Sequence, residues 1–192
     1  MLRSLEQHEA VARELAVSVP AIEALARAIC DCLAKGGRVL TFGNGGSAAE
    51  AQHLAAELVG RTAGGATPLP AMALCADAAV LTAIANDHGF TDVFARQVRA
   101  LATRQDIVIG ISTSGRSENV LRALANAREL HAVTGLLAGA GGTEAAALVD
   151  HAVIVPSRDV ARIQEMHALV VHLICETVDA WASAKGGPAA QR

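Results

Sequence analysis

The sequence predicts an α/β fold in which one parallel sheet carries helices on both faces. Five short apolar runs alternate with helical segments along the 192 residues, which is the pattern of a parallel sheet. Apolar residues make up 52% of the chain and aromatic residues only 2%, so small side chains are expected to pack helices closely onto the sheet. No repeat or interdomain linker is visible, and the length fits one domain.

The apolar runs give the expected strands, at 39–42, 71–74, 106–111, 132–137 and 151–155. The run 106–111 is the clearest of them, because it is mostly β-branched and bounded by turn residues. Helices are expected at 2–17, 20–34, from Ser47 onward, and at 77–85, 93–102, 118–130 and 160–184. Residues 62–70 are rich in Gly, Thr and Pro, which predicts a loop.

Three segments follow from this pattern: an N-terminal helical arm at 1–35, an α/β domain at 36–184 and a disordered tail at 185–192. The arm holds two helices that precede the first strand, and Pro20 suits a helix N-terminus. The first helix is amphipathic, with Leu5, Val11 and Leu15 on one face. An apolar arm outside a sheet domain often packs on another subunit, so we expect an oligomer.

Composition excludes several classes of function. The net charge is −3 and no long charge run exists, so nucleic acid is not an expected partner. No stretch of eighteen apolar residues is present, and the charged N-terminus lacks a secretory apolar region, so no membrane association is expected. The cysteines, Cys30, Cys32, Cys75 and Cys175, form no Cys-x-x-Cys pair and sit in apolar segments. They predict reduced core thiols in a cytoplasmic protein.

The chain is organised around a glycine-rich loop. The apolar run 39–42 is followed by Gly43-Asn44-Gly45-Gly46-Ser47 and then by an Ala-rich helix with Ser47 as its expected N-cap. Glycines permit positive φ and close approach of a ligand, and a helix N-terminus favours an anion. The loop matches neither a dinucleotide-binding fingerprint nor a P-loop.

Two polar pairs on separate helices could carry chemistry. His53 and Glu57 are four residues apart and share a helix face, so they could bind a metal or move protons; a partly buried polar pair is the alternative. Gln164 and His172 lie eight residues apart on one face of the last helix, where a hydrogen-bonded core histidine is the alternative. If the helices cross, the four side chains offer nitrogen and oxygen donors that zinc accepts, although an amide is an uncommon ligand.

A second polar loop, Ser112-Thr113-Ser114-Gly115-Arg116-Ser117, follows the strand at 106–111. Its hydroxyls and the following helix N-terminus suit a phosphate, while a plain turn with a Ser N-cap is the alternative. Both loops follow strands of a parallel sheet, so they lie at the same sheet edge, where such folds bind ligands. We therefore expect one site built from both loops.

Four motifs in order resemble the phosphoheptose isomerases, sedoheptulose-7-phosphate isomerases of the sugar-isomerase (SIS) domain superfamily. They are Gly43-Asn44-Gly45-Gly46-Ser47-Ala48-Ala49 with Ala51-Gln52-His53, Leu81-Thr82-Ala83-Ile84-Ala85-Asn86-Asp87, Ile111-Ser112-Thr113-Ser114-Gly115 and Arg162-Ile163-Gln164-Glu165. The resemblance covers most of the chain. The segments 62–68 and 135–142 depart from the family pattern.

The resemblance implies a three-layer sandwich with a flavodoxin-like sheet and a homotetramer with sites at subunit interfaces. It implies conversion of sedoheptulose 7-phosphate to D-glycero-D-manno-heptose 7-phosphate through an enediolate, with Glu57 and His172 as the acid/base pair. One zinc per subunit would be held by His53, Glu57, Gln164 and His172. Substrate contacts would come from Asn44, Gly45, Gly46, Glu57, Asn86, Asp87, Ser112, Thr113, Ser114, Ser117 and Gln164.

Two other functions are compatible with the fold. Replication-initiator-associating adaptor proteins resemble the chain in the glycine loop and in Arg-Ile-Gln-Glu-Met-His, the run 162–167. That group lacks acid/base residues at the positions of Glu57 and His172, so their presence favours an enzyme. A non-catalytic sugar-phosphate sensor is the third interpretation.

Overall fold

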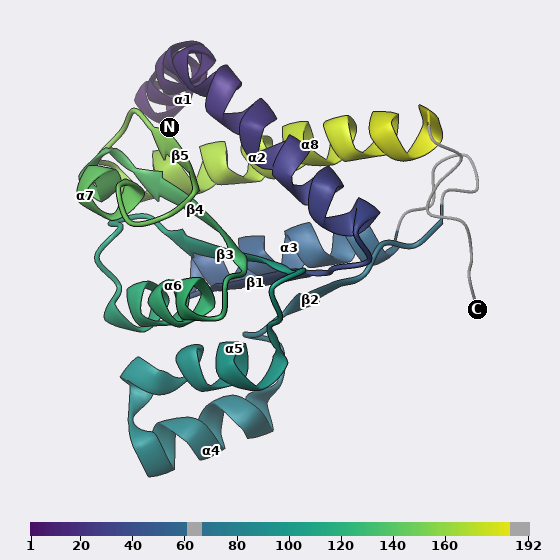
Figure 1. The fold of residues 1–192 in the computed structure, drawn as a ribbon. Helices are drawn as coiled ribbons and strands as arrows, with labels where there is room; N and C mark the ends of the chain where they lie inside the picture. Colours follow the sequence, from purple (N-terminus) through teal and green to yellow (C-terminus); the bar gives the residue numbers. More distant parts are fainter. Residues whose placement is uncertain (61–66, 185–192) are drawn as a thin grey trace.

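The computed structural model describes residues 1–60 and 67–184, and in this part of the chain it shows a five-stranded parallel sheet (Figure 1). The strand order is β2-β1-β3-β4-β5. The strands are β1 (Val39–Gly43), β2 (Ala71–Ala73), β3 (Ile107–Ser112), β4 (Val133–Gly139) and β5 (His151–Val155). The predicted fold class is confirmed, and each expected strand is present within two residues at either end.

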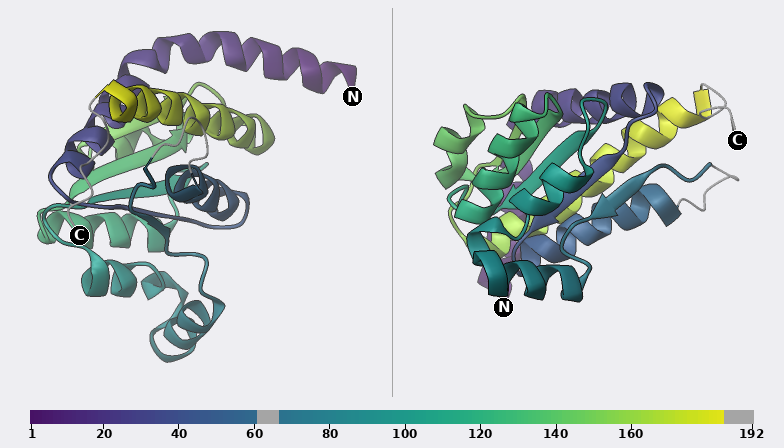
Figure 2. Two further views of the ribbon diagram at one scale, coloured as in Figure 1. Left: turned by 90° about the vertical axis from the view of Figure 1, so that its right-hand side faces the viewer. Right: turned by 60° about the horizontal axis from the view of Figure 1, so that its bottom comes forward.

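Helices cover both faces of the sheet, which gives three layers (Figures 1 and 2). The helices of the first half are α1 (Leu2–Glu14), η1 (Leu15–Ser18), α2 (Val19–Ala34), α3 (Gly46–Gly60) and α4 (Ala78–His88). Those of the second half are η3 (Phe90–Asp92), α5 (Ala95–Leu101), α6 (Glu118–Glu129), η4 (Ala140–Gly142), α7 (Thr143–Ala146) and α8 (Val160–Ala184). One apolar core lies between the sheet and α2, α3 and α8, and a second lies between the sheet and α5 and α6.

The parallel register brings both predicted loops to one edge. Gly43, at the end of β1, pairs with Ile111, and Ser112, at the end of β3, pairs with Ala138. Every residue of β1 and β3 is buried, so these two central strands form a rigid base under the loops. Fully burying a branched apolar side chain stabilises the fold by about 1.5–3 kcal/mol. A shift of one residue would move these side chains to the other face of the sheet, so their burial fixes the register of both strands.

Several helix boundaries differ from the expected ones. The first helix ends at Glu14. The 3₁₀ turn η1 follows it, and Leu15 at the start of this turn is buried in the core. Helix α3 begins at Gly46, so Ser47 lies inside the first turn rather than at the N-cap. The helix expected at 93–102 is shortened to 95–101, and a 3₁₀ turn at Phe90–Asp92 precedes it. The loop at 62–70 falls mostly, and the tail at 185–192 entirely, outside the described residues.

Two helices lie on the periphery. Neither α1 nor α4 contains a buried residue. Helix α1 projects along the start of α8 (Figure 2) and is attached there by hydrogen bonds from Arg162 to the Ser4 carbonyl and between His8 and Glu165. Within the described residues, no helix is long and apolar enough to cross a membrane.

The cysteines occupy apolar surroundings, as expected for core thiols. Cys30, Cys32 and Cys175 are buried and Cys75 is half-buried. The Sγ of Cys32 lies 3.1 Å from the Gln105 carbonyl, and burial raises the pKa of this thiol to about 11. A thiol with so high a pKa carries little thiolate at neutral pH and is a poor nucleophile.

Candidate active site

The three glycines of the first loop serve different purposes. Gly45 has φ +55°, the left-handed conformation that favours glycine. At Gly43 an added Cβ would lie 2.7 Å from the Ser47 carbonyl oxygen and 2.8 Å from that of Ile111, so no side chain fits there. An added Cβ on Gly46 would lie 2.3 Å from the Gln164 amide nitrogen. Only one of the three glycines therefore provides positive φ, and the other two allow close packing.

A pair of asparagines joins the two loops. Asn44 Nδ2 donates to Asn119 Oδ1 at 2.9 Å, and Asn119 Nδ2 donates back to Asn44 Oδ1 at 2.9 Å. Asn119 is buried at the start of α6, directly behind the hydroxyl loop. The two hydrogen bonds hold the glycine loop to the second loop, which supports a single site built from both. Sequence reasoning missed Asn119.

Helices α3 and α8 bring three predicted residues together. One nitrogen or oxygen atom from each of His53, Glu57 and His172 lies within 4.8 Å of the other two. The rings of His53 and His172 meet edge to face with centroids 4.8 Å apart, and His53 Nε2 is 3.6 Å from Glu57 Oε1. His172 is exposed, so the alternative of a core histidine does not hold for it.

A second carboxylate orients His53. Glu50 lies one turn earlier on α3, and its Oε2 is 3.2 Å from His53 Nδ1. This contact favours a proton on Nδ1 and leaves Nε2 turned toward Glu57 as an acceptor. Carboxylates in this position are common behind histidines that bind metal. The i, i+3 spacing of Glu50 and His53 was available in the sequence as a signal, but sequence reasoning did not use it.

The donor set of the cluster fits a zinc ion. Two imidazole nitrogens and one carboxylate oxygen are ordinary zinc ligands. Ligands at about 2.1 Å in a tetrahedral site lie about 3.4 Å apart, so the 3.6 Å between His53 Nε2 and Glu57 Oε1 is close to that spacing. The cluster of three leaves a fourth tetrahedral position for a further ligand.

Gln164 lies at the glycine loop. Its amide packs against Gly46 at the start of α3, about two helical turns before His53 along that helix. Its predicted role as the fourth metal ligand stays a prediction, as does its role in binding substrate.

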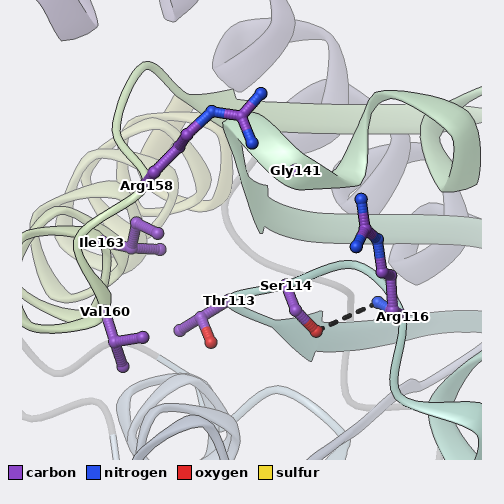
Figure 3. Close-up of a pocket in the computed structure, with 7 residues that line it drawn as sticks. All are labelled: Thr113, Ser114, Arg116, Gly141, Arg158, Val160 and Ile163. Atoms are coloured by element: carbon purple, nitrogen blue, oxygen red, sulfur yellow. Dashed lines mark hydrogen bonds between the residues drawn. The ribbon is translucent and has the colours of Figure 1, made fainter.

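The hydroxyl loop divides into two pairs. Ser112 is buried, and its Oγ lies 3.0 Å from that of Ser117, the N-cap residue of α6. Thr113 and Ser114 instead line a cavity of about 190 Å³ at the end of the strands (Figure 3). All four hydroxyls belong to one loop, but only Thr113 and Ser114 border this cavity.

Two predicted substrate-binding residues lie elsewhere. Asn86 and Asp87 are exposed near the end of α4, and Asn86 Nδ2 donates to Asp87 Oδ1 at 2.7 Å. Helix α4 packs, through Leu81 and Ile84, on the side of the sheet opposite α3 and α8. Within one chain, Asn86 and Asp87 therefore lie on the face of the sheet opposite the histidine cluster.

A different histidine is the buried one. His167 on α8 is fully buried, and within the described residues neither ring nitrogen makes a hydrogen bond, although the ring lies beside the backbone of Ala138. Burial lowers the pKa of His167 to about 4, so the ring is neutral at pH 7. It is therefore a core residue, one turn away from Gln164.

Comparison with known proteins places this arrangement among the sugar-isomerase domains. The SIS domain family matches residues 5–138, more than half of the chain. A phosphoheptose isomerase of Campylobacter jejuni is 48% identical over 174 residues, covering 91% of this chain and 94% of the relative. One from Solidesulfovibrio magneticus is 54% identical over 158 residues, covering 82% and 77%.

Solved structures agree. The phosphoheptose isomerase of Neisseria gonorrhoeae superposes with a TM-score of 0.88 at 39% identity, covering 93% of this chain and 96% of the other. That of Francisella tularensis gives a TM-score of 0.90 at 39% identity, covering 93% and 95%. The chain belongs to the phosphoheptose isomerase family.

Proposed function

We propose that the protein is an aldose–ketose isomerase that converts sedoheptulose 7-phosphate to D-glycero-D-manno-heptose 7-phosphate through an enediolate. The observation that carries the proposal is the convergence of Glu57 and His172 with His53, from two helices that are distant in sequence. The names of the relatives, phosphoheptose isomerases over most of both chains, support the same reaction.

The reaction moves a proton between C1 and C2 of the sugar and needs two kinds of group. One group must remove and return the carbon-bound proton, and another must serve the oxygens that gain and lose negative charge. Glu57 takes the first role, because it is the carboxylate of the cluster. His172 takes the second, because an imidazole nitrogen can donate a proton to an oxygen or accept one from it.

Zinc is the metal that the donors suit, with one ion per subunit held by His53, Glu57 and His172 and completed by Gln164. When bound, a zinc ion with a single anionic ligand keeps net positive charge and polarises a carbonyl or stabilises an oxyanion. Glu50 fixes the ring of His53 for this role. The donor atoms of the cluster support the metal, and Gln164 lies at the adjoining loop.

The rest of the site binds the sugar phosphate. Backbone at Gly45 and Gly46 lets the sugar approach closely, and Asn44 keeps the glycine loop joined to the second loop. The hydroxyl loop and the N-terminus of α6 suit the phosphate group. The residues assigned to substrate are Asn44, Gly45, Gly46, Glu57, Asn86, Asp87, Ser112, Thr113, Ser114, Ser117 and Gln164.

The working form is a homotetramer in the cytoplasm. Helices α1 and α4 have no buried residues, yet they expose Leu2, Leu5, Val80 and nearby Phe90. Covering these side chains with neighbouring subunits would remove apolar surface from water. It would also allow Asn86 and Asp87 to contribute to a neighbouring subunit's site. Light scattering should give four times the mass of one chain; a monomer at micromolar concentration would contradict this assembly.

The activity is tested with the ketose phosphate in deuterated water. Purified protein should form heptose 7-phosphate and introduce deuterium at C2 of the product, because the proton passes through a group that exchanges with solvent. Protein that gives neither product nor exchange, while capturing a protein partner, would support the adaptor interpretation instead.

A further inference from the structure

The start of α8 lies between helix α1 and the glycine loop at the beginning of α3 (Figure 2). Arg162 and Glu165 bind residues of α1, whereas Gln164, between them in sequence, packs its amide against Gly46. At about 100° per residue, Arg162 and Glu165 project about 60° apart, and Gln164 projects about 130° away from their midline. Four consecutive residues therefore contact α1 on one side of α8 and the glycine loop on another.

Arg162 is the centre of the contact with α1. Its side chain is only 12% exposed, and its guanidinium donates to the Ser4 carbonyl through Nη1 and to Glu165 Oε1 through Nη2. Among the described residues, Glu165 is the only carboxylate within ion-pair distance of this guanidinium. A nearly buried charge that loses its partners is costly, so Arg162 restricts where Ser4 and its helix can lie.

Glu165 extends the contact to a second residue of α1. Its Oε2 lies 2.7 Å from His8 Nδ1, and because a carboxylate only accepts hydrogen bonds, the proton lies on Nδ1. Arg162 occupies the other oxygen, so both oxygens of this carboxylate are used. Ser4 and His8 are four residues apart, which is about one helical turn. Two successive turns of α1 are therefore bound to the start of α8.

These polar contacts hold the N-terminal half of α1 in place. Residues 2–10 are all exposed, and the helix first packs against the core at Val11 and Ala12. Apolar burial therefore does not fix the turns that carry Ser4 and His8. Exposed ion pairs contribute little stability on their own, so the half-exposed His8 is the weaker link and the nearly buried Arg162 is the stronger one.

The Gln164 amide depends on how its own turn is held. Within the described residues no hydrogen bond fixes this amide, so its position is set by packing against Gly46 and by the placement of the first turns of α8. Arg162 and Glu165 hold those turns from the side of α1. A shift of these turns toward or away from α1 would move the amide relative to the glycine loop.

We propose that Arg162, Glu165 and His8 are positioning residues, which fix the first turns of α8 to α1 and so keep the Gln164 amide at the glycine loop. The inference rests on the proposed function, in which Gln164 completes the metal site and contacts the sugar. It assigns none of the three positioning residues a contact with metal or substrate. Helix α1 thereby supports the active site of its own chain, in addition to its proposed part in assembly.

The test compares full-length variants in two quantities, zinc affinity from competition with a coloured chelator and KM for sedoheptulose 7-phosphate. Arg162→Gln should weaken zinc binding about tenfold and raise KM about as much, because the support of a ligand is lost. His8→Ala should change both about threefold, because its contact is half-exposed. At saturating zinc, kcat should stay within about twofold, because these contacts do not involve the proton-transfer residues.

Two further variants on α1 serve as controls. His8→Asn can place an N–H near the position of Nδ1 and should recover part of the loss seen in His8→Ala. Arg13→Ala breaks the exposed ion pair with Glu9 on the same helix, without touching α8, and should leave zinc affinity and KM unchanged. Hydrogen exchange of residues 2–10 should be faster in His8→Ala and Arg162→Gln than in the wild type, because a helix half without tertiary contacts frays.

A double-mutant cycle separates positioning from a general loss of structure. In a Gln164→Ala background, His8→Ala should lower zinc affinity no further, because the contact acts through the amide. If His8→Ala has its full effect in that background, the contact does not act through Gln164 and the proposal is wrong. Unchanged zinc affinity and KM in variants whose faster exchange shows that α1 has been released would overturn it as well.

The zinc and exchange measurements need no turnover, so they separate this inference from the proposed function. A wild type that gives no product, but whose zinc affinity depends on His8 through Gln164, would overturn the function and retain the positioning role. A wild type that turns over the ketose, with zinc affinity and KM unchanged in His8→Ala and Arg162→Gln, would overturn the positioning role and leave the isomerase.

Discussion

The units β1–loop–α3 and β3–loop–α6 follow the same plan and differ in what their helices face. Helix α6 buries Val120, Ala123 and Leu124 in the core, so only its N-terminal loop is left for a ligand. Helix α3 also packs on the sheet, but a second helix, α8, lies beside it and brings His172 to His53. One plan thus yields a loop rich in hydroxyl groups in one unit and an ionisable cluster in the other. The presence or absence of a second helix beside α3 or α6, rather than the loop before that helix, decides which chemistry is possible.

The largest effect expected from this comparison is on the α3 unit. Glu57→Gln keeps the shape of the side chain and removes its basicity, so turnover should fall by about 10²–10⁴ while substrate still binds. His172→Asn should act similarly. Steady-state kinetics and deuterium exchange measure both. Full turnover in both variants would leave an isomerase but remove these residues from its mechanism.

The loops themselves should differ in their tolerance of a methyl group. Gly115→Ala combines left-handed strain with a clash against Gly142 backbone, so it should lower the free energy of unfolding by about 3 kcal/mol. Gly45→Ala has similar φ but open space around the Cβ, and should cost about 1 kcal/mol. Chemical denaturation measures the difference. Equal costs at the two positions would show that the second loop is not held by its packing on Gly142.

The contact that orients His53 can be tested through metal retention. Glu50→Gln should weaken zinc binding about 10–100-fold, because the neutral amide supports the ring less well than a carboxylate. Glu50→Asp should recover part of the loss, and Glu144→Gln on α7 is a matched control. Competition with a coloured chelator reports zinc affinity without reference to turnover. Zinc affinity unchanged by Glu50→Gln would remove this residue from the metal site.

The last effect concerns the buried histidine and depends on pH. Burial lowers the folded-state pKa of His167 to about 4, below the ordinary value of 6.5, so the unfolded chain binds a proton first as pH falls. Stability from this group is complete above pH 6.5 and is lost progressively toward pH 4, by about 2 kcal/mol at pH 5. The difference in unfolding free energy between pH 7 and pH 5 should shrink in His167→Met. His131→Asn, at an exposed histidine, is the control and should keep the wild-type difference in unfolding free energy between the two pH values. If His167→Met also keeps that difference, His167 is not the group responsible for it.

Much of the fold could be predicted from the sequence, because its signals are local. Buried strands such as 107–112 are continuous apolar runs, and Asp77 marks the start of α4 by capping the Val80 N–H. Helical spacing predicted that His53 and Glu57 share one face of α3, but it left their role open. The family resemblance supplied the wider list of site residues.

The remaining features depend on contacts between distant residues. Asn119 is 75 positions from Asn44, and no local pattern announces their pairing. The rotation of α8 about its axis decides that His167 is buried and His172 exposed, although both stand among apolar neighbours in the sequence.

The asparagine pair also constrains how this family can vary. Each side-chain amide donates one hydrogen bond to the other and accepts one from it. Replacing either asparagine therefore leaves the partner amide without one donor and one acceptor, and this loss is costly at Asn119 because Asn119 is buried. Replacing both together removes the deficit, so the two substitutions are strongly non-additive. A lineage that changes this contact must pass through a less fit single mutant or change both residues at once. We therefore expect Asn44 and Asn119 to be inherited as a pair.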